Sequence, residues 1–318
     1  MIQGMPPQEP TRLQRYKGAL LGLAVGDAIG TTVEFASRGT FTPLTDMVGG
    51  GPFQLQPGEW TDDTSMALCL ATSLIFTGEF DARDQMNRYC NWMRYGYLSS
   101  TGECFDIGAT VSRALNSYLV SGDAMSGSPD PRSAGNGALM RLAPVPMRYA
   151  ASEAQTWRFA GESTRTTHGA QEAIECSRLF ALQLRAALLG ASREEILETR
   201  PLEPLSAKVQ ALAAANYRDK PREAIKGSGY CVESLEAALW CFAGTTTFEE
   251  AVLLAANLGD DADTTAAICG QIAGAFYGAA AIPARWRSRL TLGQEIAGMA
   301  GRLWALSNGE NPDFLEKV

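Results

Sequence analysis

The chain has 318 residues, enough for one large domain or two modest ones with a substantial buried core. Hydrophobic residues make up 46% and charged residues 19%, which is typical of a globular protein and excludes a disordered one. The net charge of -8 argues against a nucleic-acid partner, because phosphate neutralisation needs clustered Lys and Arg.

The N-terminal region is predicted to be a flexible tail, residues 1–11, followed by a helix. Basic residues precede the apolar run GALLGLAVGDA, an arrangement that imitates a signal peptide. The run is short and rich in glycine, and it ends at Asp27, which favours a buried helix instead. No stretch approaches the length of a membrane span, so we expect no membrane partner.

Helical periodicity dominates the rest of the chain, and alternating β-branched runs are nearly absent. The loops between the helices are rich in Gly, Pro and Ser, and loops of that length are usually functional or disordered. No linker divides the chain, so the sequence predicts a single all-α domain over residues 12–318. The predicted helices are 13–28, 64–76, 81–93, 107–120, 170–189, 232–242, 248–257, 264–281 and 292–307, and the long loops are 45–60, 121–137 and 219–230.

Seven cysteines are scattered along the chain, and none forms a C-x-x-C pair. An odd number without regular spacing indicates reduced, mostly buried thiols and excludes a disulfide framework or a zinc ribbon. We therefore expect a cytoplasmic protein.

Two stretches crowd aspartates at predicted helix starts: WTDDTSMAL from residue 60 and GDDADTTAA from residue 259. The first has an ordinary interpretation, in which Thr61 caps a helix and Asp62 and Asp63 favour the positive end of its dipole. This interpretation suits the second stretch less well, because three carboxylates within one turn repel one another. Carboxylates and hydroxyls are hard oxygen ligands that suit Mg²⁺, Mn²⁺ or Ca²⁺. Two such stretches at neighbouring helix starts would suit a pair of ions.

Other motifs fit poorly. The second stretch lacks the Gly and Glu of an EF-hand loop, and neither stretch completes the DDxxD box of isoprenoid synthases. The chain has neither a G-x-S-x-G elbow nor a phosphate-binding G-x-x-x-x-G-K-[ST] loop. His168 is the only histidine, and from sequence it is either a structural hydrogen bonder or a base.

Five segments together resemble the conserved boxes of the ADP-ribosylglycohydrolases: GALLGLAVGDAIGTTVEF, WTDDTSMAL, AGNGALMRLAPV, THGAQEAIECSRLFA and NLGDDADTTAAICGQIAGAFYG. The resemblance covers residues 16–307 and points to the dinitrogenase reductase-activating type. It implies an all-helical fold, a site for two Mg²⁺ or Mn²⁺ ions, and hydrolysis of the bond between ADP-ribose and a protein side chain. In this branch that side chain is most often arginine.

The resemblance also implies roles for individual residues. Asp106 matches an active-site aspartate of arginine-specific members, and Glu34 matches an acidic residue implicated as a base in serine-specific relatives. Asp260 takes a supporting position behind the metal ligands. The implied ligands are Thr61, Asp62, Asp63, Asp261, Asp263 and Thr264, and the implied ADP-ribose contacts are Ser133, Gly135, Asn136, Gly137, His168 and Tyr230.

Two departures concern the substrate region. Ala109 stands where nitrogenase-regulating members carry Asn, and Pro131 lies near the place where they carry Glu. Both departures concern which protein and which side-chain linkage the enzyme acts on, more than they concern the reaction that it catalyses. The glycine loop at residues 133–138 is expected to present backbone N–H groups to a diphosphate, although an ordinary turn would have the same sequence.

The expected enzyme is a monomer that takes an ADP-ribosylated protein as substrate and releases ADP-ribose. Two alternatives stay open at this point. One is a non-catalytic antidote module that contacts an ADP-ribosyltransferase and blocks it, or holds its product. The other is a hydrolase of small ADP-ribose conjugates.

Overall fold

Two helices packed backbone to backbone form the centre of the fold. The computed structural model describes residues 9–310, in which α1 (Arg12–Gly30) and α12 (Ala262–Tyr277) run antiparallel. A Cβ atom added to Gly22 would lie 2.2 Å from the carbonyl oxygen of Gly270, so the contact leaves no room for a side chain. The small residues recur every fourth position along both helices and pair as Gly18 with Gly274, Gly22 with Gly270, Gly26 with Ala266, and Gly30 with Ala262.

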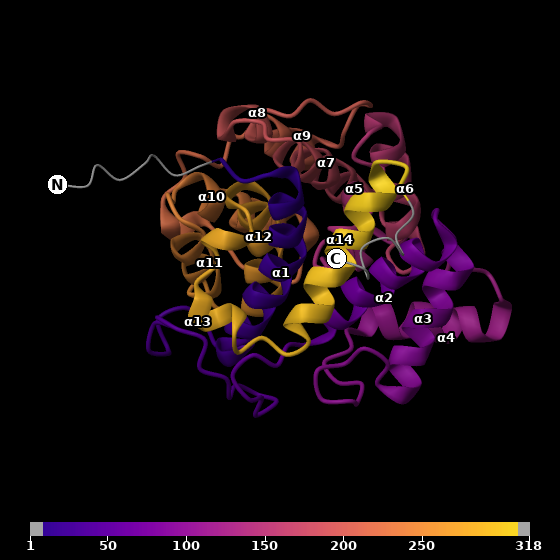
Figure 1. The fold of residues 1–318 in the computed structure, drawn as a ribbon, viewed down its shortest axis with the longest axis horizontal. Coiled ribbons are helices and arrows are strands. Elements are labelled where there is room, and N and C mark those ends of the chain that lie inside the picture. Colours follow the sequence, from indigo (N-terminus) through magenta and orange to yellow (C-terminus); the bar gives the residue numbers. More distant parts are fainter. Residues whose placement is uncertain (1–8, 311–318) are drawn as a thin grey trace.

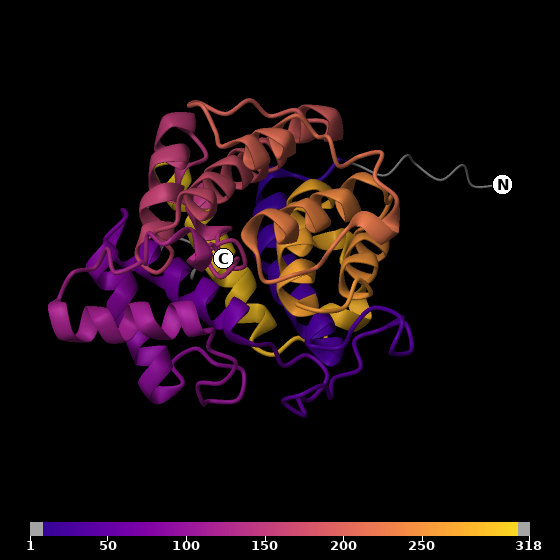
Figure 2. The ribbon, with the colours of Figure 1, turned by 180° about the vertical axis from the view of Figure 1, so that it is seen from behind.

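The remaining helices surround this pair. Figures 1 and 2 show α2, α3 and α4 on one side of α1 and α10, α11 and α13 on the other, while α14 contacts α1, α2 and α5. These helices are α2 (Asp62–Thr77), α3 (Ala82–Tyr95), α4 (Ala109–Ser121), α5 (Pro144–Tyr149), α6 (Glu153–Arg165), α7 (Gln171–Leu188), α8 (Arg193–Leu197), α9 (Ala207–Ala213), α10 (Cys231–Ala243), α11 (Phe248–Ala256), α13 (Ala284–Arg287) and α14 (Gly293–Ser307).

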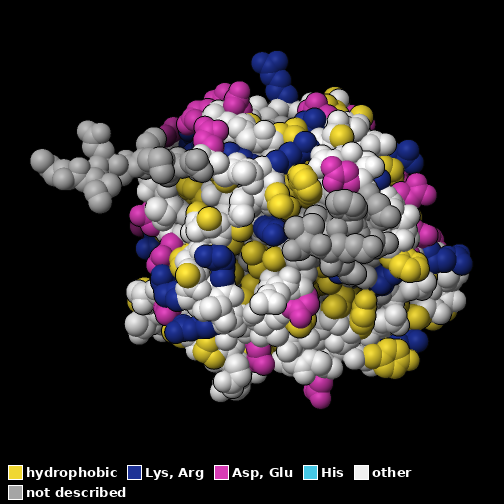
Figure 3. Space-filling view, in the orientation of Figure 1, with side chains coloured by type: hydrophobic (Ala, Val, Ile, Leu, Met, Phe, Trp, Pro, Cys, Tyr) yellow, Lys and Arg dark blue, Asp and Glu magenta, His cyan; other side chains and the backbone are white. Residues whose placement is uncertain are grey.

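Short 3₁₀ helices and loops complete the chain. Residues 9–310 contain isolated β-bridges but no strand, so the predicted all-α fold is confirmed there. On the face seen in Figure 3, basic and acidic side chains are interspersed with apolar ones. The 3₁₀ helices are η1 (Thr31–Val33), η2 (Pro131–Ser133), η3 (Arg222–Ala224) and η4 (Ala279–Ala281).

Each predicted helix is present, with boundaries that shift by a few residues. The exception is the C-terminal end of α12, which the periodicity extends to residue 281 but which stops at Tyr277, because Gly278 adopts φ 78° and turns the chain. Sequence reasoning missed α5, α6, α8, α9 and α13. In α6 the buried face is largely Thr, Ala, Gly and Ser, so it carries little apolar signal, and the others have seven residues or fewer.

The apolar run near the N-terminus is a buried helix, as predicted. Every residue of α1 from Gly18 to Gly30 is buried, Asp27 included. Most of the predicted tail, residues 1–8, lies outside the described residues, and the Thr11 side chain caps α1 by accepting from the Gln14 amide. Among residues 9–310, none of the helices combines the length and the apolar composition that crossing a bilayer requires. All seven cysteines are free, and six of them are buried.

Candidate active site

The starts of α2 and α12 bring the two aspartate stretches to one cleft of about 370 Å³. Glu34 follows η1, which continues α1, while Asp62 lies in the first turn of α2 and Asp263 in the first turn of α12. No Lys or Arg stands among the described residues that line the cleft, so its walls carry acidic side chains without a basic partner. The lining consists of Glu34, Phe35, Asp62, Asp106, Ile107, Gly108, Ala109, Thr110, Val111, Gly135, Asn136, Gly137, Met140, His168, Gly229, Asp261, Asp263 and Thr264.

Hydrogen bonds join the two stretches directly. The Thr264 hydroxyl donates to an Asp63 oxygen over 3.2 Å. The Thr61 hydroxyl lies 3.2 Å from Asp263 Oδ2. The structure therefore places two segments about 200 residues apart in one acidic cluster, as the paired stretches predicted.

Asp27 is a buried acid that sequence reasoning did not place next to the aspartate stretches. It is fully buried in α1, and its two oxygens accept from the backbone N–H and hydroxyl of both Thr61 and Thr64, over 2.6–3.0 Å. This corrects the capping interpretation of Thr61, which occupies the N-cap position of α2 but makes no side-chain cap because its hydroxyl faces Asp27 and Asp263. The signal was present in the sequence, since a carboxylate that ends a buried apolar run must find donors.

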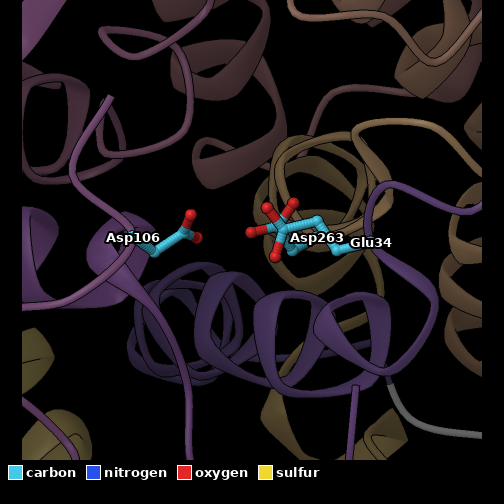
Figure 4. Close-up of side chains that lie close together, drawn as sticks. All are labelled: Glu34, Asp106 and Asp263. Atoms are coloured by element: carbon cyan, nitrogen blue, oxygen red, sulfur yellow. The ribbon is translucent and has the colours of Figure 1, made fainter. Parts of the chain in front are cut away.

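Three carboxylates from separate segments face one another in the cleft (Figure 4). Oxygen atoms of Glu34, Asp106 and Asp263 lie within 4.8 Å of one another. Within residues 9–310, Glu34 Oε2, Asp263 Oδ1 and Asp63 Oδ2 are buried without a hydrogen-bond partner. Buried carboxylate oxygens without donors are costly, and divalent cations would satisfy them. The donor set therefore fits hard metal ions.

Burial, reinforced by neighbouring carboxylates, raises the pKa of the acids in this cluster. It raises the pKa of Glu34 to about 9, with Asp106 as the next largest cause. It also raises the pKa of Asp106 to about 7, with Asp27 as the next cause, and holds the pKa of Asp263 well above its usual range. Without a cation, the cluster must keep several protons near neutral pH. Bound cations would take their place.

The backbone around the acids adopts conformations that favour glycine. Asp106, Phe35 and Asp260 have φ of 59°, 63° and 58°, in the left-handed region. The Phe35 N–H donates to the Asp260 carbonyl over 2.7 Å and the Asp260 N–H donates to the Ala36 carbonyl over 2.8 Å. This pair of bonds fixes Glu34 beside the start of α12. The Asp260 side chain itself is exposed and does not line the cleft.

The glycine loop forms one wall of the cleft through Gly135, Asn136 and Gly137. The Asn136 side chain donates to Asp261 Oδ2 over 2.8 Å, which links the loop to the acidic cluster. The amides of Gly135 and Asn136 donate to the carbonyls of Ser133 and Gly229. These two amides are therefore engaged within the protein, and the expectation that the loop presents N–H groups rests on its other amides.

His168 is buried beside this loop. Its Nδ1 lies 2.9 Å from the Thr167 hydroxyl, and that hydroxyl accepts from the Arg141 guanidinium over 2.6 Å. In the tautomer that carries its hydrogen on Nε2, Nδ1 accepts from the Thr167 hydroxyl. Burial, and secondarily Arg141, lowers the pKa of His168 to about 3. A neutral imidazole that holds a proton so weakly is a hydrogen bonder and not a general base at neutral pH.

The remaining predicted contacts lie at the edges of the cleft. Ser133 lines an adjoining hollow of about 520 Å³ between α4 and the loop before η2, and its hydroxyl donates to the Asp130 carbonyl. Tyr230 is half-buried, and its backbone pairs with Gly135, but its hydroxyl donates to Glu172 and accepts from Lys208. Neither side chain is among the residues that line the cleft.

The two positions that depart from the family pattern lie at the cleft and beside the adjoining hollow. Ala109 begins α4 and lines the cleft, so the missing amide leaves open space there. Pro131 begins η2 and is exposed, beside the adjoining hollow.

The family model described as ADP-ribosylglycohydrolase matches residues 8–313. The chain belongs to this family. It is 46% identical over 294 residues to ADP-ribosylarginine hydrolase Tri1 of Pseudomonas putida (strain GB-1), covering 92% of this chain and 78% of that protein. It is 44% identical to the protein of the same name from Serratia proteamaculans (strain 568), covering 95% and 82%.

Two further similarities support the family and the fold. The ADP-ribosyl-[dinitrogen reductase] glycohydrolase of Rhodospirillum rubrum is 32% identical, covering 94% of this chain and 98% of that protein. A chain of the solved structure titled "ADP-ribosylglycohydrolase-related protein complex" superimposes with a TM-score of 0.84 at 44% identity, covering 93% of this chain and 99% of that one. The predicted family is confirmed, and the arginine hydrolases share more residues with this chain than the dinitrogen reductase type does.

Proposed function

We propose that this chain is a metal-dependent ADP-ribosylarginine hydrolase. One observation carries the proposal: in a chain of this family, unpartnered carboxylate oxygens of Glu34 and Asp263 are buried at a cleft whose described lining has no Lys or Arg. Such a cleft suits divalent cations and the cationic guanidinium of the substrate. Relatives at 44–46% identity are named ADP-ribosylarginine hydrolases, which supports arginine as the linkage.

Two Mg²⁺ or Mn²⁺ ions are part of the proposal. When bound, they would grip ribose hydroxyls and make a coordinated water more acidic. Asp27 would orient the Thr61 ligand through the hydrogen bonds that it accepts. The proposed ligands, carried by α2 and the start of α12, are Thr61, Asp62, Asp63, Asp261, Asp263 and Thr264.

Asp106 and Glu34 would act on the reacting bond. Cleavage at the anomeric carbon develops positive charge on the sugar, and a carboxylate such as Asp106 beside it stabilises that charge. Glu34 has a buried oxygen without a donor, which is free to take a proton from the attacking water. The guanidine then leaves, and free ADP-ribose is the second product.

The glycine-loop side of the cleft would hold the rest of ADP-ribose. A neutral His168 offers one N–H donor in an acidic site, and a neutral donor suits a diphosphate oxygen. The proposed contacts are Ser133, Gly135, Asn136, Gly137, His168 and Tyr230. The seven free thiols support a cytoplasmic location for this reaction.

The deciding experiment follows ADP-ribose release from ADP-ribosylarginine, with Mg²⁺ or Mn²⁺ and with a chelator, using wild-type protein and Asp106→Ala. We expect metal-dependent release by the wild type and loss of most turnover in Asp106→Ala, which still binds ADP-ribose within about tenfold. Tight binding of ADP-ribosylated protein without release would instead establish a non-catalytic module. Full release without metal would contradict the proposal.

A further inference from the structure

Three phenylalanine rings form a connected ridge beside the catalytic acids. The Phe35 and Phe53 rings meet edge to face with centroids 6.5 Å apart, and the Phe53 and Phe105 rings meet at 5.2 Å. Phe35 follows Glu34 and Phe105 precedes Asp106, while Phe53 comes from the loop that leads to α2. Figures 1 and 2 show the loops after η1 and after α3 at the same end of the molecule.

Core packing does not explain Phe35. Its side chain is 70% exposed, and it lines the mouth of the acidic cleft. Its backbone is also in the left-handed region, at φ 63°, which a bulky side chain occupies at a cost in free energy. An exposed ring in a strained position contributes little to folding, so a role in contact with another molecule accounts for it better.

The charges around the ridge restrict what that molecule is. The cleft beside Phe35 carries five carboxylates and no basic side chain among its described lining residues. Asp260, tied to Phe35 by a backbone hydrogen bond, is exposed, as is Glu103 near Phe105. The guanidinium of Arg38, three residues after Phe35, is engaged elsewhere, because it donates to the carbonyls of Leu258, Arg222 and Ile225. An aromatic face bordered by carboxylates favours a cationic, apolar-stemmed group such as arginine.

We propose that the Phe35–Phe53–Phe105 ridge docks the polypeptide that bears the modified arginine, contacting the residues that flank that arginine. This inference rests on the proposed function and adds a prediction to it. The ridge contributes to recognition of an ADP-ribosylated protein, whereas the conjugate of ADP-ribose with free arginine has no polypeptide to place there. The enzyme should therefore discriminate between the two substrates through these rings.

The test compares kcat/KM for an ADP-ribosylated protein with kcat/KM for free ADP-ribosylarginine, in wild type, Phe35→Ala and Phe53→Ala. We expect the ratio of protein to free conjugate to fall at least tenfold in both variants, mainly through KM, and Phe35→Tyr to keep it. Phe76→Ala is the matched control, because that ring is 77% exposed at the far end of α2, ~20 Å along the helix from Asp62. It should leave the ratio unchanged.

The outcomes separate the two proposals. An unchanged ratio overturns the ridge. If the ratio is unchanged because both substrates lose activity equally, the ring contacts the ADP-ribosylarginine that they share. Hydrolysis of neither substrate by wild type overturns the proposed function instead. In that case the ridge is tested by binding alone. Phe35→Ala must weaken the binding of the ADP-ribosylated protein at least tenfold more than it weakens the binding of free ADP-ribose. A smaller difference overturns the ridge as well.

Discussion

The backbone N–H of Thr61 donates to a carboxylate oxygen of Asp27 over 2.9 Å, although the two residues are 34 positions apart. This oxygen also lies 3.0 Å from the Thr61 hydroxyl. An acid on α1 therefore caps α2 from outside, in place of the Thr61 side chain. The arrangement leaves the Thr61 oxygen positioned next to Asp263, between the two aspartate stretches.

Asp27→Asn should loosen this arrangement without changing the size of the side chain. The amide NH₂ would face donors, so about 2 kcal/mol of unfolding free energy should be lost, lowering Tm by ~3 °C. Affinity for Mg²⁺ or Mn²⁺, measured by calorimetry, should fall about tenfold because ligand orientation is lost. Asp81→Asn is the control, since Asp81 caps α3 by accepting from the amides of Arg83 and Asp84. Wild-type metal affinity in Asp27→Asn would show that Asp27 does not orient the ligands.

The stability of the metal-free protein should depend on pH. The pKa values of Asp27, Asp106 and Glu34 are raised to about 6, about 7 and about 9, above the ~4 of unfolded carboxyls. The folded chain then binds more protons than the unfolded chain, so its stability is greatest below pH 4 for these groups and is lost as pH rises through each folded value.

Thermal unfolding in a chelator should therefore show Tm falling between pH 5 and pH 9. Saturating Mg²⁺ should cancel or reverse this slope, because cations replace the protons and bind only the native state. Glu34→Gln should flatten the alkaline part of the curve. A chelated protein whose Tm does not change over this range would contradict the argument.

The contact between α1 and α12 should not tolerate a methyl group. In Gly22→Ala the new Cβ would meet the Gly270 carbonyl at 2.2 Å, so the helices must separate and about 3 kcal/mol of stability should be lost. Gly298→Ala in α14 is the matched control, because nothing lies within 4 Å of its Cβ position. Without a clash, that change should add ~0.5–1 kcal/mol. Denaturant unfolding measures both, and equal effects would mean that close packing does not hold the site together.

The contact between α1 and α12 shows which features of the molecule can be predicted from the sequence and which cannot. Helical periodicity indicates the main helices, and two stretches of hard oxygen ligands indicate the acidic cluster. The partnership between Gly22 and Gly270 depends on which helices meet, and a one-dimensional pattern carries no such information. Asp27 escapes prediction for a similar reason: its donors, on Thr61 and Thr64, become neighbours only when α1 and α2 pack together.

The chain should prefer arginine linkages to serine linkages. The guanidinium of ADP-ribosylarginine is cationic before the bond breaks, and a carboxylate at Asp106, within a cleft of other acids, faces that charge and the charge that passes to the sugar, whereas a serine linkage starts neutral. Hydrolysis of ADP-ribosylarginine should exceed that of ADP-ribosylserine by about 100-fold, roughly 2.7 kcal/mol of transition-state discrimination. Rates on both conjugates, compared in wild type and Asp106→Asn, measure this, and the neutral amide should narrow the gap. Equal rates, or a preference for serine, would mean that the space beside Ala109 has changed the specificity of the pocket.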